Sequence, residues 1–216
     1  MIGRGVAKLR ELAENRQPEK VLTGIGVFDA LTGGLIRGGI CELSGADGAG
    51  KRSLAVSLTA AATGRGGVCA VVDGTGGFDP VSAERSGALL EKILWVRCGG
   101  DVTKAILSAE YLIQARLFEL IWLDLAGFSE DVLATLPSSY WYRFKTGLQG
   151  SPGSLLVTLR EPRVRSAAHQ TLRVTAESVH WHGRADFNLI GRINARLECL
   201  RPVPGRKMLT LGAEGY

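Results

Sequence analysis

The sequence lacks the features that mark membrane, secreted and metal-binding proteins. No uninterrupted apolar run approaches the roughly 18 residues that a membrane span needs. The first ten residues contain no apolar core of a secretory signal, so we expect a cytoplasmic protein. The cysteines are widely spaced and form no C-x-x-C pair, so we expect reduced core thiols and no metal site at Cys41, Cys69, Cys98 and Cys199.

Acidic and basic side chains balance along most of the chain but not near its end. Residues 1–158 carry 16 of each, whereas residues 159–216 carry 10 basic and 5 acidic side chains. The whole formal net charge of +5 therefore lies in the last quarter, where nine of the ten basic residues are Arg. Arg suits planar contact with phosphate or carboxylate. Two interpretations stay open for this region, nucleic-acid contact and a solvated surface.

Residues 40–54 organise the chain, as a short apolar strand, a glycine-rich loop and the start of a helix. The spacing of Gly45, Gly50 and Lys51 is that of the phosphate-binding loop, in which backbone N–H groups and a helix N-terminus bind phosphate. The last position breaks the motif, because Arg52 stands where a magnesium-binding hydroxyl belongs. The candidate nucleotide-binding residues are Gly45, Gly48, Gly50, Lys51, Arg52, Ser53 and Asp124.

Apolar strands alternate with helices along most of the chain. Buried strands are predicted at residues 40–43, 68–73, 120–124 and 155–159, and another short strand at 93–96. Helices are predicted at 53–63, 101–117 and, broken at Pro137, 129–150. Alternating residues at 171–181 and 187–200 predict an antiparallel pair. The expected fold is α/β, a mostly parallel twisted sheet flanked by helices with antiparallel strands at its C-terminal end. We expect an N-terminal helix and linker at 1–20, a core domain at 21–200 and a tail at 201–216.

Four segments, taken in order, resemble the core of the RecA recombinases: residues 23–39, the glycine loop, residues 69–80 and residues 118–124. The short C-terminal portion is most similar to the ImuA branch (ImuA/SulA-like), accessory proteins of the SOS mutagenesis apparatus. The resemblance implies a RecA-like P-loop core in a cytoplasmic bacterial protein. It implies the polymerase-like protein ImuB and an error-prone polymerase as partners, with RecA as a further candidate and no membrane contact.

Three catalytic positions of that family are altered. Besides Arg52, Thr75 stands where the family has the Glu that activates water, and Leu159 where it has a Gln that senses the γ-phosphate. Losing a general base typically costs about 10²–10⁴ in rate. Asp124 keeps the acidic position at the end of an apolar strand. We therefore expect no catalytic residue and little or no ATP hydrolysis.

Two interpretations of the loop stay open, and neither requires a cofactor. In the first, Lys51 and Arg52 bind the phosphates of ATP without metal. In the second, the loop is only a scaffold, and Arg52 pairs with Asp124 or Asp73. Ser53 supplies the missing hydroxyl only if the helix begins one residue out of register.

The DNA-binding loops of the family correspond to residues 137–149 and 160–170 of this chain. Candidates for DNA or partner contact are Arg160, Arg163, Arg165, Trp141 and Arg143. An amphipathic helix at residues 4–15 is expected to dock on the core or on a second copy. Docking on a second copy would give a homo-oligomer. The favoured function is an interaction module in translesion synthesis and DNA damage tolerance. The alternatives are a DNA-dependent ATPase of the recombinase type and a SulA-like cell-division inhibitor.

Overall fold

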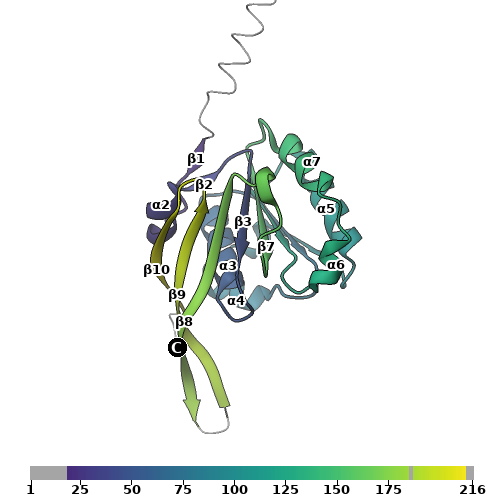
Figure 1. Ribbon diagram of the computed structural model, residues 1–216. Helices are drawn as coiled ribbons and strands as arrows, with labels where there is room; N and C mark the ends of the chain where they lie inside the picture. Colours follow the sequence, from purple (N-terminus) through teal and green to yellow (C-terminus); the bar gives the residue numbers. More distant parts are fainter. Residues whose placement is uncertain (1–18, 185–186, 213–216) are drawn as a thin grey trace, which may run out of the picture.

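An eight-stranded mixed sheet supports the other elements (Figure 1). The computed structural model describes residues 19–184 and 187–212, with side chains described outside 181–191 and 212. The helix expected at residues 4–15 lies outside this range. The strand order is β10-β9-β8-β3-β7-β6-β4-β5. The expected α/β class, with a mostly parallel sheet and antiparallel strands at the C-terminal end, is confirmed.

The strands of this sheet are β3 (Ile40–Ser44), β4 (Cys69–Asp73), β5 (Ile93–Arg97), β6 (Leu120–Asp124), β7 (Ser154–Leu159), β8 (Gln170–Arg184), β9 (Phe187–Arg201) and β10 (Gly205–Gly212). The helices are α2 (Gly26–Thr32), α3 (Lys51–Gly64), α4 (Pro80–Arg85), α5 (Val102–Ala115), α6 (Glu130–Ala134) and α7 (Ser139–Leu148). A two-stranded sheet of β1 (Lys20–Val21) and β2 (Leu35–Ile36) precedes β3, and 3-10 turns lie at Leu90–Lys92 and Arg165–Ala167.

The strands β3, β4, β6 and β7 are buried along their whole length. Strands covered on both faces need no alternation of polar and apolar residues, so these segments are recognisable as continuous apolar runs. Their parallel pairing brings their carboxyl ends to one edge of the sheet. The glycine loop, Asp73 and Asp124 therefore lie along the same edge, where ligands of open α/β sheets bind.

Helices cover both faces of the parallel part of the sheet. On one face α3 and α4 pack against the strands in a core that contains Trp122, and on the other α5, α6 and α7 do so in a core that contains Phe144. All four cysteines are free and buried, which confirms the expected core thiols. Within the described residues, no helix is both long and apolar enough to span a membrane.

The ends of the helices follow local side-chain chemistry. The Asp101 carboxylate caps α5 by accepting a hydrogen bond from the backbone N–H of Lys104 at 3.0 Å, as its position predicts. The expected break at Pro137 is also present, because α6 ends at Ala134 and α7 begins at Ser139.

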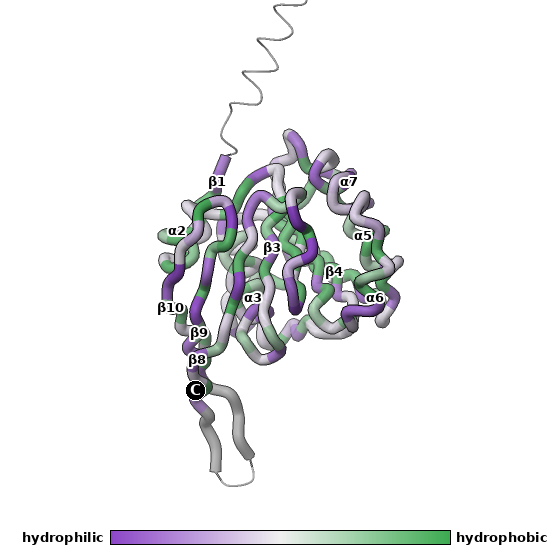
Figure 2. Tube along the Cα trace, in the orientation of Figure 1, coloured by the Kyte–Doolittle hydropathy of each residue, from purple (hydrophilic) through white to green (hydrophobic). Residues whose placement is uncertain are grey.

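The antiparallel strands β8–β10 extend the sheet beyond β3 and bury one face. Their inward side chains, such as Val174 and Leu209, join the core on the α3 side. Figure 2 shows hydrophilic segments along β9 and β10. Residues 205–212 lie in the expected C-terminal tail but form β10, so the sheet continues past residue 200. The reason is that Leu209 and Leu211 are buried at alternate positions of this short segment.

Candidate functional site

The glycine-rich loop between β3 and α3 has the backbone shape that its sequence predicts. Gly48 and Gly50 have φ angles of 76° and 94°, in the left-handed region that favours glycine. Gly50 is the N-cap of α3, and a Cβ atom at this position would lie 2.5 Å from Cδ1 of Leu211 in β10. Both the backbone angle and the close neighbour therefore require glycine here.

Lys51 is buried at the start of α3 and contacts the loop. Its Nζ donates to the backbone oxygen of Ala46 at 3.0 Å and to Oδ1 of Asp47 at 3.3 Å. Burial lowers the pKa of Lys51, against the hydrogen bond and the charge of Asp47. The Asp47 carboxylate also pairs with Arg160 at 2.7 Å. Burial raises the pKa of Asp47, but Lys51 and Arg160 outweigh that effect and lower the pKa overall.

Arg52 forms an ion pair with Asp124 at the end of β6. Nε of Arg52 lies 2.7 Å from Oδ2 of Asp124, and the carboxylate is fully buried. The other carboxylate oxygen, Oδ1, accepts hydrogen bonds from Thr158 Oγ1 at 2.6 Å and from the backbone N–H of Ala126 at 3.1 Å. The Trp122 indole N–H donates to the same Thr158 hydroxyl at 3.0 Å. Protein donors therefore contact both oxygens of Asp124.

These residues do not fit Mg²⁺, which phosphate-loop enzymes bind through a loop hydroxyl and a strand carboxylate. Arg52 places a guanidinium at the hydroxyl position and on the carboxylate itself. Ser53 does not replace the hydroxyl, because α3 begins at Lys51 without a register shift and Ser53 is exposed. Of the two partners expected for Arg52, Asp124 and Asp73, the structure shows Asp124.

Asp73 and Thr75, at and just after the end of β4, contact neighbouring backbone and side chains of the protein. Oδ1 of Asp73 accepts hydrogen bonds from the backbone N–H groups of Gly76 and Gly77, both at 2.8 Å. The other oxygen accepts the indole N–H of Trp95 at 3.2 Å. The Thr75 side chain packs so closely on Gly127 that a Cβ atom there would overlap its hydroxyl. No carboxylate occupies position 75, which resembles the water-activating position of the RecA core.

The end of β7 lies beside the glycine loop, and it carries Leu159 where the RecA family has a Gln. Leu159 is fully buried in the core on the α5 side. The next residue, Arg160, accepts a hydrogen bond from the Gly45 N–H at its backbone oxygen (3.0 Å), and its guanidinium pairs with Asp47. Arg160 therefore belongs with the glycine loop rather than with a separate DNA-binding surface.

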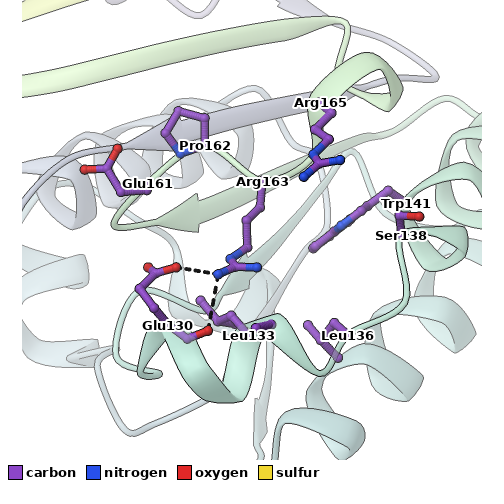
Figure 3. A pocket seen from close by; sticks show the side chains of 10 residues that line it. Glu130, Leu133, Leu136, Ser138, Trp141, Glu161, Pro162, Arg163 and Arg165 are labelled. Carbon is purple, nitrogen blue, oxygen red and sulfur yellow. Dashed lines mark hydrogen bonds and ion pairs between the residues drawn. The ribbon is translucent and has the colours of Figure 1, made fainter.

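A pocket of about 410 Å³ lies between α6, the start of α7 and the segment after β7 (Figure 3). Trp141, Arg163 and Arg165 line it, so the structure brings together three of the five candidates for DNA or partner contact. Arg163 pairs with the Glu130 carboxylate at 2.6 Å. Within the part of the chain that the structure describes, the Arg165 side chain has no ion-pair partner.

Arg143 does not join this pocket. Its guanidinium pairs with Glu110 of α5 and lies 5.3 Å from the centre of the Tyr140 ring. The aromatic residues of α7 divide between the core and the surface, because Trp141 is buried whereas Tyr142 is exposed. This division follows from helical spacing, which sends neighbouring side chains of α7 to different faces.

Glu42, which is not among the candidates from the sequence, anchors the segment that carries the pocket residues Arg163 and Arg165. This buried carboxylate in β3 accepts hydrogen bonds from the backbone N–H groups of Arg163 and Val164, the latter at 2.8 Å. Thr171 donates to its other oxygen at 3.3 Å. Burial raises the pKa of Glu42, against these three hydrogen bonds. The only signal in the sequence is one acidic residue inside an apolar strand.

Comparisons with known proteins agree with this architecture. The family model of the RecA N-terminal domain matches residues 3–129. Protein RecA of Parvibaculum lavamentivorans is 40% identical over 173 residues, which cover 78% of this chain and 43% of the relative. Protein RecA of Rhodospirillum rubrum is 32% identical over 176 residues (80% and 44%), and that of Aquifex aeolicus 30% over 180 residues (82% and 47%). The chain spans less than half the length of these curated relatives.

Proposed function

This chain belongs to the RecA family, and we propose that it is an accessory member of the ImuA type that hydrolyses ATP weakly or not at all. In this proposal it is an interaction module of SOS-induced translesion synthesis and DNA damage tolerance. The observation that supports the proposal most is the 2.7 Å ion pair between Arg52 and Asp124. It places a protein cation on the carboxylate that a magnesium-dependent ATPase keeps for its metal.

Two further positions support a site without hydrolysis. A threonine hydroxyl does not accept a proton at neutral pH, so Thr75 cannot act as the general base, and losing that base costs about 10²–10⁴ in rate. Leu159 is apolar and fully buried, so it cannot hydrogen-bond a phosphate. Because these changes affect separate steps, restoring one residue is not expected to restore turnover.

The partners are part of the proposal. We propose the polymerase-like ImuB and an error-prone polymerase, with RecA as a further partner. Direct DNA contact receives less support, because Asp47 and Glu130 neutralise Arg160 and Arg163. Of the three arginines at the expected DNA-binding segment, this leaves Arg165 for an external anion. An exposed ion pair contributes little stability, so a protein partner could still replace these contacts.

Phosphate release measured with ATP, Mg²⁺ and single-stranded DNA tests the proposal. The expected turnover equals that of the Lys51→Ala variant, which lacks the phosphate-binding lysine. Magnesium-dependent turnover that Lys51→Ala abolishes would contradict a non-hydrolysing role. Immobilised protein should retain the polymerase-like partner and not the division GTPase.

The second candidate is a DNA-dependent ATPase of the recombinase type. The relatives named Protein RecA and the intact backbone of the glycine loop favour it. The phosphate-release measurement decides between the two, because only this candidate expects turnover that rises with single-stranded DNA. A SulA-like role is distinguished by the retention experiment, since it expects the division GTPase as partner.

A further inference from the structure

Cationic side chains outnumber carboxylates beside the glycine loop. Lys51, Arg52 and Arg160 contact two carboxylates, those of Asp47 and Asp124. These five groups therefore leave one positive charge beside the loop. A site that binds a metal–phosphate complex would instead keep the Asp124 carboxylate free for the metal.

The loop backbone also offers donors. Among the described residues, no backbone acceptor forms a hydrogen bond with the N–H groups of Gly48, Gly50 or Lys51. The left-handed φ angles at Gly48 and Gly50 turn successive peptide units of a loop inward, which is how a glycine loop forms an anion-binding nest. An external anion at the start of α3 would accept these hydrogen bonds and interact with the helix dipole.

Arg52 is held in one position. Its Nε donates to Asp124, and its guanidinium lies against the backbone of Gly77, where a Cβ atom would be 2.6 Å from Cζ of Arg52. The side chain is 35% exposed. Within the described part of the chain, only its Nε has a hydrogen-bond partner, so the two terminal nitrogens are available to a ligand. A guanidinium fixed in this way loses little conformational freedom when it binds phosphate, and its fork suits phosphate oxygens.

We propose that Arg52 serves as the built-in cation of this site, so that the loop binds the phosphates of a nucleoside triphosphate without Mg²⁺. The inference deepens the proposed function and rests on it, because a site with a fixed protein cation holds the nucleotide without the metal that hydrolysis needs. Arg52 neutralises Asp124, which would otherwise repel the phosphates. Lys51 and the loop N–H groups supply the remaining contacts.

Equilibrium dialysis with labelled ATP, in EDTA and in Mg²⁺, tests this inference on the full chain. We expect ATP to bind in EDTA at least as tightly as in Mg²⁺. Because Arg52→Ser alone leaves the buried Asp124 uncompensated, the test variant is Arg52→Ser with Asp124→Asn, which removes both charges. It should bind ATP about tenfold more weakly in EDTA, the loss expected for one charge-assisted contact.

The matched control is Arg65→Ser, at the other end of α3. The Arg65 side chain is also 35% exposed and ion-paired, with Glu119, and is expected to leave ATP affinity unchanged. ATP binding that requires Mg²⁺, binding that is indifferent to Arg52, or no binding in EDTA would each overturn the inference. Phosphate release from the same samples is a separate readout, since turnover contradicts the proposed function whereas the affinity in EDTA decides the role of Arg52.

Discussion

The hydroxyl of Thr158 in β7 donates to the buried carboxylate of Asp124 in β6 at 2.6 Å. The same hydroxyl accepts the indole N–H of Trp122, so a single side chain connects two other polar groups inside the sheet. Thr158→Val keeps the shape but leaves the buried Trp122 N–H without its acceptor. We expect a loss of about 1–3 kcal/mol in the free energy of unfolding, measured in urea.

Thr175→Val is the control for this substitution, because Thr175 is an exposed threonine of β8. It should change the free energy of unfolding by less than about 0.5 kcal/mol. Equal effects of the two substitutions would mean that the Thr158 hydroxyl contributes nothing beyond its packing.

The Arg52–Asp124 pair is expected to show energetic coupling in a double-mutant cycle. Arg52→Ala leaves a buried carboxylate uncompensated, which we expect to cost about 2 kcal/mol, less than for a fully buried pair because Arg52 is 35% exposed. In an Asp124→Asn background the same substitution should cost at least about 1 kcal/mol less. The exposed pair of Arg65 and Glu119 provides the comparison cycle and should couple more weakly. Additive effects at Arg52 and Asp124 would argue against the pair as a stabilising contact.

Glu42 should make stability depend on pH. Burial raises the pKa of Glu42 in the folded state above its ordinary value of 4.5, so folding favours the protonated carboxyl. The contribution of Glu42 to stability is therefore fully present below about pH 4.5, where the carboxyl is protonated in both states. The contribution is lost as pH rises through the higher folded pKa. Glu42→Gln cannot ionise, and its amide oxygen can still accept both backbone N–H groups. The stability of this variant relative to the parent, from urea unfolding, should therefore increase between about pH 4 and 7.

Glu84→Gln, at an exposed site of α4, is the control and should show no such increase. Glu42→Ala should destabilise the protein at every pH, because it leaves the N–H groups of Arg163 and Val164 without an acceptor. A constant difference between Glu42→Gln and the parent would show that Glu42 titrates alike in the folded and unfolded states.

Self-association is expected to depend on the N-terminal segment. The apolar stripe of Val6, Leu9, Leu12 and Ala13 predicts an amphipathic helix that docks on the core or on a second copy. The resemblance to RecA, which docks such a helix on a neighbour, favours the second copy. Deleting residues 1–18 leaves the described core intact and should convert an oligomer to a monomer in light scattering. A parent chain that is already monomeric would show that the segment has another role.

Continuous apolar strands and the glycine loop could be predicted because their signals are local. The buried strand that ends at Asp124 and the cap at Asp101 follow from short stretches of sequence. The contacts of Asp47 with Arg160 and of Glu42 with the segment after β7 could not, because each joins residues more than a hundred positions apart in an order that only the sheet topology sets. The strand β10 was missed because two buried leucines in a short segment after prolines give a weak alternation.

The position of β3 in the sheet also bears on when the glycine loop can form during synthesis. Its neighbours are β7 and β8, and the Ser44 hydroxyl bonds the backbone oxygen of Leu172, 128 positions later. Gly50 contacts Leu211 of β10, which the ribosome makes later still. Such distant pairing is slow to form. The loop is therefore synthesised early, but we expect it to reach its native packing only after β8 and β10 have been synthesised.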